Sequence, residues 1–116
     1  MKFISTVVTT NPDQAGTPPP ELYEAIGKLA AETGKEVLLD TGSMKSLGAM
    51  KVEKGNTIVD GPYTEAKEAV GGYAIFELPS EQAMFEYCEK FIELHRRLWP
   101  AWEGTVTVQQ LMSMGP

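Results

Sequence analysis

The densest group of side chains that could do acid–base chemistry lies between residues 60 and 68. Asp60 precedes a Gly61-Pro62 pair that sets a tight turn, because glycine accepts a positive φ and proline fixes φ. The stretch that follows adds two more carboxylates and Lys67. Asp60 could act as a general base if burial raised its pKa, or could instead accept backbone N–H bonds that hold the turn. Both interpretations stay open.

A second candidate for proton transfer is His95, whose ordinary pKa lies near neutral pH. It falls on the apolar stripe of a predicted helix, so it is either a core residue or the acid or orienting partner of Asp60. Lys67 could fix an anionic or carbonyl group, or belong to a solvated turn. Tyr63 and Trp99 could line the mouth of a substrate pocket, or pack in a core or dimer contact.

Helices and strands that would position these residues can be predicted from periodicity and turn signals. β-branched and aromatic runs predict strands, and apolar residues at helical spacing predict helices between Pro20 and Gly34 and from Glu81 to Leu98. The residues from Asn11 to Pro20 are rich in proline and glycine and predict a loop. The predicted strands are 2–9, 36–40, 47–52, 57–59, 72–78 and 105–112, with a hairpin turn at 53–56.

This order of elements predicts an α+β fold, a ferredoxin-like two-layer sandwich (βαββαβ with an extra hairpin strand). Two helices can cover only one face of the sheet. The strand 2–9 nevertheless carries Phe3 and Val7 on one face and Ile4 and Val8 on the other. We therefore expect a homodimer that buries the second face by two-fold symmetry, the alternative being a monomer with a moderately apolar open sheet.

Composition and charge narrow the class of protein. A chain of 116 residues predicts one domain spanning 1–116, and its net charge of −6 with a pI near 4.7 argues against nucleic-acid and membrane-surface partners. A single cysteine, Cys88, fits a reducing cytoplasm and is interpreted as a packing residue. No spacing typical of a metal site or a phosphate loop occurs, so we expect neither metal nor cofactor.

The stretch from Asp60 to Glu68 followed by Gly71-Gly72-Tyr73 resembles the YCII-related family, specifically its DGPF-domain branch. That branch is named for an Asp-Gly-Pro-Phe motif, in which Tyr63 here replaces the phenylalanine. The resemblance extends over the whole chain, including residues 36–39 and the segment from Trp99 to Gly104. It implies a dimeric α+β barrel whose wider group includes small-molecule isomerases, a dehydrochlorinase and monooxygenases.

This sequence departs from the pattern of the YCII branch in one respect. In the YCII branch proper, a His–Asp pair with the histidine near the first helix has been proposed as the active site. This sequence has no histidine there, and only His95 could replace it.

Two functions are therefore carried forward. The first is cofactor-free acid–base chemistry of the isomerase or lyase type on a small cyclic or carbonyl compound. In it, Asp60 would be the base, His95 its partner, and Lys67 or Tyr63 the polarising group, with Trp99 at the substrate. The second is a non-catalytic small-molecule-binding or regulatory dimeric module.

Overall fold

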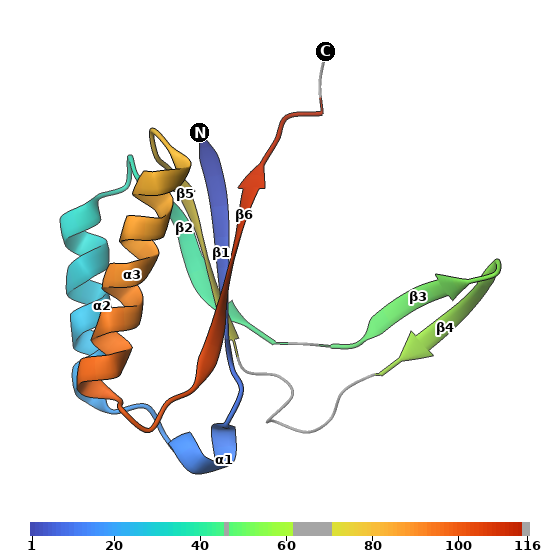
Figure 1. Cartoon of the computed structure of the whole chain (residues 1–116), viewed down its shortest axis with the longest axis horizontal. Coiled ribbons are helices and arrows are strands. Elements are labelled where there is room, and N and C mark those ends of the chain that lie inside the picture. Colours follow the sequence, from blue (N-terminus) through green and yellow to red (C-terminus); the bar gives the residue numbers. More distant parts are fainter. Residues whose placement is uncertain (46, 62–70, 115–116) are drawn as a thin grey trace.

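The computed structural model of the chain describes residues 1–45, 47–61 and 71–114 (Figure 1). Two long helices lie together on one side of a sheet, and a separate hairpin extends from the other side. The elements follow in the order β1 (Lys2–Thr9), α1 (Pro12–Ala15), α2 (Pro20–Thr33), β2 (Leu38–Met44), β3 (Ala49–Glu53), β4 (Asn56–Asp60), β5 (Gly71–Glu77), α3 (Glu81–Leu98) and β6 (Gly104–Leu111).

Four of the described strands form an antiparallel sheet in the order β2-β5-β1-β6. Helix α2 connects β1 to β2 and helix α3 connects β5 to β6, and in each case one other strand lies between the two that are joined. Both helices cover the same face (Figure 1). This is the ferredoxin-like α+β arrangement, as the sequence predicted.

Local signals explain where the long helices begin and end. Helix α2 has proline in its first turn and ends at Gly34, whose φ of 83° few other residues adopt. Helix α3 begins after Ser80, whose Oγ accepts a hydrogen bond from the Ala83 N–H. Its last turn carries Arg96 and Arg97, whose positive charges interact favourably with the C-terminal end of the helix dipole.

The hydrophobic core lies at one end of the helix-facing side of the sheet. Phe3 of β1 and Phe76 of β5 are a cross-strand pair, and both pack against Met84 and Cys88 of α3. Each of the four is buried, with at most 6% of its surface exposed. Burial at this end therefore fixes α3 on the sheet through large apolar side chains.

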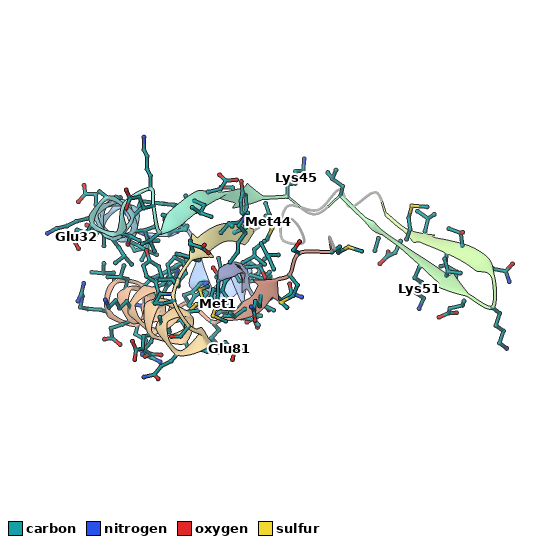
Figure 2. The ribbon with its side chains drawn as sticks, turned by 90° about the horizontal axis from the view of Figure 1, so that it is seen from above. Met1, Glu32, Met44, Lys45, Lys51 and Glu81 are labelled. Carbon is teal, nitrogen blue, oxygen red and sulfur yellow. The ribbon has the colours of Figure 1, made fainter. Side chains whose placement is uncertain are left out.

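Strands β3 and β4 form a two-stranded sheet of their own rather than adding to the main one. They are joined by a two-residue turn at Lys54-Gly55, where φ is 51° and 81°. Positive φ at both positions is typical of the turns that match the twist of a hairpin. Every residue of β3 and β4 is exposed, and Figure 2 shows Lys51 far from the helices and the main sheet.

Three local predictions were wrong. The hairpin turn predicted at 53–56 comprises only residues 54 and 55, because Glu53 and Asn56 pair with each other. The predicted loop 11–20 contains the short helix α1, which has proline in its first turn and ends at Gly16, with φ of 70°. The second strand begins at Leu38 and continues to Met44 rather than ending at 40. It begins late because the N–H groups of Val37 and Leu38 both bond to the Gly34 carbonyl, and it continues because residues 41–44 pair with β5. No helix among the described residues is long and apolar enough to cross a membrane.

Candidate small-molecule cavity

A cavity of about 300 Å³ lies between the sheet and the two long helices. Its volume is at the lower end of the range typical of ligand pockets, ~300–1,000 Å³. The lining is mostly aromatic and small: the described residues that form it include tyrosines, tryptophans, serines, glycines and one histidine, and no Asp, Glu, Lys or Arg. Such a wall suits a small neutral molecule better than an ion.

The cavity exists because side chains on the sheet become smaller along two paired strands. On the helix-facing side, Phe3 pairs with Phe76 in the core, but the next pair is Ser5 with Ala74, and the one after is Val7 with Gly72. The helices stay in place above the sheet, so the small residues leave volume unfilled. The same two strands therefore build a packed core at one end and a cavity at the other.

The opposite wall is aromatic and is held by specific hydrogen bonds. The Trp99 indole Nε1 donates to the Ala15 carbonyl at 2.9 Å, and the Trp102 indole Nε1 donates to Thr9 Oγ1 at 2.9 Å. Asn11 also holds the loop that contains both tryptophans. Its side-chain amide donates a hydrogen bond to the Ala101 carbonyl and accepts one from the Glu103 N–H. Both indole donors are thus used to position the rings, which leaves their apolar surfaces to the cavity.

His95 is the basic group of this cavity. The side chain is only 5% exposed, and its ring lies against Phe91 and Trp102, with centroid distances of 4.7 Å and 4.4 Å. This burial lowers the pKa of His95 below its ordinary value, an effect partly opposed by its hydrogen bond to the Phe91 carbonyl. The imidazole is consequently neutral at pH 7.

The tautomer of His95 follows from the hydrogen bond that it makes within the described part of the chain. Nδ1 lies 3.0 Å from the Phe91 carbonyl oxygen, and because a carbonyl can only accept, Nδ1 carries the proton. Nε2 makes no hydrogen bond to any described residue. Among the described residues, every fully enclosed side-chain nitrogen or oxygen has a hydrogen-bond partner. Because Nε2 has no such partner there, it is not fully enclosed and keeps access to solvent. His95 therefore presents an unprotonated, basic nitrogen.

Other titratable groups at the cavity are less available. Burial raises the pKa of the Cys88 thiol, so the thiolate is disfavoured. Thr33 donates its hydroxyl proton to the Leu29 carbonyl, so the 2.9 Å contact with Tyr87 is a bond that Tyr87 donates. The Tyr73 hydroxyl donates to Asp40, and that hydrogen bond raises the pKa of Tyr73. Cys88 and Tyr73 are therefore held in their protonated forms, and the Tyr87 hydroxyl uses its hydrogen in the bond to Thr33.

The structure brings together only some of the residues predicted from the sequence to form a site. His95 and Trp99 both line the cavity. Asp60 lies at the end of β4, exposed and apart from the lining residues, next to Gly61, whose φ is 133°. Tyr63 and Lys67 lie outside the described residues. The base that the sequence placed at Asp60 is thus not positioned beside His95.

Sequence reasoning missed the residues that create the cavity. Ser5, Gly72 and Ala74 carry no catalytic signal, and their importance lies in their size. The signal was present in the alternation of β1 and β5, where helix-facing positions change from phenylalanine to serine, alanine and glycine. That signal could be recognised only with knowledge of the register between the two strands.

Within the described residues, no three His, Cys, Asp or Glu side chains gather closely enough to hold a metal ion.

Comparison with known proteins gives no functional assignment. No protein-family model matches the chain, and no curated protein does. Among solved structures, the chain is similar to the divalent cation tolerance protein (Cut A1) from Thermus thermophilus, with a TM-score of 0.40 and 12% sequence identity. That alignment covers 99% of this chain and 88% of the other. A likeness this distant says nothing about activity, which must be argued from the cavity itself.

Proposed function

We propose that this protein is a cofactor-free acid–base enzyme of the isomerase or lyase type that acts on a small, neutral cyclic or carbonyl compound. The observation that carries the proposal is the neutral His95, with Nδ1 tied to the Phe91 carbonyl and Nε2 unbonded to described residues, in the wall of an otherwise uncharged cavity. A general base must be unprotonated at the working pH and held in a fixed orientation. His95 meets both conditions.

The reaction would begin with removal of a proton from carbon next to a carbonyl group. Nε2 of His95 takes the proton, and the electrons of the C–H bond move to the carbonyl oxygen to give an enolate. When the compound carries a β,γ double bond, the enolate is a conjugated dienolate. The resulting imidazolium then returns the proton to the γ carbon, so the double bond moves and the isomerisation is completed without loss of atoms or charge. The hydroxyls of Ser5 and Ser43 line the cavity and bond to no described residue, so they are available to donate to the enolate oxygen.

The proposal assigns the base to His95 rather than to Asp60, and it retains the YCII-related resemblance and a cytoplasmic location. Support for the family comes from the motif at 60–73, of which residues 62–70 lie outside the described residues. A homodimer belongs to the same proposal. The face of the sheet without helices carries Val8, 46% exposed, and Leu111, 39% exposed, so a second copy would remove apolar surface from water.

Proton abstraction can be tested without knowing the natural substrate. Cyclic ketones, enones and lactones are incubated in deuterated water, and NMR measures exchange of the hydrogens next to the carbonyl. His95→Asn is the informative variant, because its side-chain amide can keep the bond to the Phe91 carbonyl while the base is lost. Arg96→Gln is the matched control, since Arg96 is its exposed neighbour and is absent from the cavity lining.

Wild type and Arg96→Gln are expected to accelerate exchange of at least one compound, and His95→Asn to lose about 10²–10⁴-fold of that rate. Equal rates in wild type and His95→Asn would exclude His95 as the base.

The rival function, a non-catalytic binding or regulatory module, is favoured by one observation: the described lining contains no carboxylate, lysine or arginine to assist catalysis. Saturable binding with no exchange on any compound would support that module instead.

A further inference from the structure

The β3–β4 hairpin has one apolar face and one polar face. Residues directly opposite in an antiparallel pair share a face, and residues alternate between faces along each strand. Met50 is paired with Val59 and Val52 with Thr57, so one face carries three apolar side chains and a threonine. The other face carries the pairs Ala49 with Asp60, Lys51 with Ile58, and Glu53 with Asn56, as well as a salt bridge between Lys51 and Glu53.

The apolar face is largely open to solvent in the single chain. Met50 is 72% exposed, Val52 69% and Val59 62%. An isolated two-stranded hairpin is marginally stable in water and normally needs to pack against something else. Three of the four large apolar side chains of these exposed strands lie on one face, and Ile58 lies on the other; this concentration indicates that the apolar face has a partner.

The position of the hairpin limits where that partner lies. In both views the helices are on one side of the main sheet and the hairpin extends away on the other (Figures 1 and 2). The hairpin thus reaches past the face of the sheet that carries no helix. A molecule packed on that open face would lie beside the hairpin.

The total surface also exceeds that of a compact monomer. The chain exposes 8285 Å². A folded monomeric protein of its mass is expected to expose about 6,200 Å², so the excess is roughly 2,000 Å². A stable protein–protein interface buries about 800 Å² on each partner, and obligate dimers bury more. The excess is large enough for one extensive interface.

We propose that the hairpin is an arm that packs its apolar face, Met50, Val52 and Val59, against a second copy of this chain docked on the open face of the sheet. The inference rests on the homodimer proposed above. Two-fold symmetry favours a second copy as the occupant, because each chain supplies both an arm and an open face and each covers the other's. The arm's polar face has charges of both signs, Lys51 with Glu53 and Asp60, so it offers no strong field that would select a highly charged partner.

Two matched double variants of the full chain test the arm. Met50→Thr with Val59→Thr changes a cross-strand pair on the apolar face. Lys51→Thr with Ile58→Thr changes the neighbouring pair on the polar face. Threonine keeps the preference for strand in every case. Analytical ultracentrifugation measures the mass and the dissociation constant, and near-ultraviolet circular dichroism of Trp99 and Trp102 reports whether the cavity region remains folded.

Wild type is expected to sediment as an oligomer of this chain. The apolar-face variant should raise its dissociation constant by about tenfold or more, with the tryptophan spectrum unchanged, and the polar-face variant should change it by less than about twofold. An oligomer that neither variant weakens, or that both weaken equally, would overturn the arm while leaving the homodimer in place. A wild-type monomer at about 100 μM would overturn both the arm and the dimer, but would leave the chemistry at His95 untouched.

A photoreactive amino acid at position 50 or 51 separates contact with a second copy from contact within one chain. Cross-linking from position 50 is expected to give a covalent dimer, with the attachment on the open face near Val8 or Leu111, and position 51 to give little product. Attachment from position 50 only within the same chain would overturn the inference.

Discussion

His95 is surrounded by groups that suit its neutral form. Its ring lies against Phe91, Trp99 and Trp102, and Nδ1 donates to a carbonyl that cannot release a proton in return. Protonation would place a charge among aromatic rings, with no carboxylate among the described lining residues to pair with it. The same environment that makes His95 a base should therefore make the fold sensitive to acid.

Stability is expected to depend on pH through His95. Burial lowers its pKa in the folded chain, so below its ordinary value of about 6.5 the unfolded chain binds more protons than the folded one. The free energy of unfolding should therefore fall as pH decreases from 6.5 to the lowered pKa, and should not change for this reason above 6.5.

His95→Phe isolates this contribution, because a phenylalanine ring suits the same aromatic surroundings and does not titrate. Urea unfolding at a series of pH values is expected to show a shallower dependence on pH below 6.5 in the variant than in wild type. An identical slope in both proteins would show that His95 is not buried in its neutral form.

Glycine at position 104 is required by the indole of Trp102. A Cβ added there would fall inside the Trp102 ring, so Gly104→Ala must displace the ring and its bond to Thr9. We expect a loss of ~1–3 kcal/mol in the free energy of unfolding and a shift in tryptophan fluorescence. Gly27→Ala is the control: nothing lies within 4 Å of its added Cβ, and in helix α2 it should gain ~0.5–1 kcal/mol. Equal effects at the two sites would contradict this packing.

At the scale of elements, the sequence predicted most where a local signal decides the structure. The strand 2–9 and the helix 81–98 were predicted with the bounds that the structure has, because β-branched residues, a serine cap and a clear apolar stripe are local properties. Strand β2 was placed too early, because its end depends on pairing with β5. The cavity could not be predicted at all: it depends on Ser5 lying opposite Ala74, which only the register establishes.

Helix α3 carries His95 at one end and should depend on its cap at the other. Ser80→Ala removes the oxygen that accepts from the Ala83 N–H and is expected to cost about 1 kcal/mol in the free energy of unfolding. Ser80→Thr keeps that oxygen and should cost less. Chemical denaturation of the three proteins provides the measurement. If Ser80→Thr were as destabilising as Ser80→Ala, the loss would come from packing at Ser80 and not from the cap.

At the scale of the whole molecule, three regions have different relations to solvent. The core around Phe3 and Met84 is closed, the cavity around His95 is partly open, and every residue of the hairpin strands is exposed. The core of one chain does not pack against the hairpin, so in a monomer the hairpin should be only marginally stable at any protein concentration. Association with a second copy would supply the missing packing.

Hydrogen exchange as a function of protein concentration measures this directly. In β3 and β4, amides are expected to exchange rapidly at about 1 μM and to slow by at least about tenfold at about 100 μM, because association populates the covered arm. Amides that pair β1 with β5 lie in the core of each chain and should change far less. In the double variant Met50→Thr with Val59→Thr, the exchange rates of the hairpin amides should depend little on protein concentration. Hairpin amides that are equally protected at both concentrations would mean that the arm is stable without a partner.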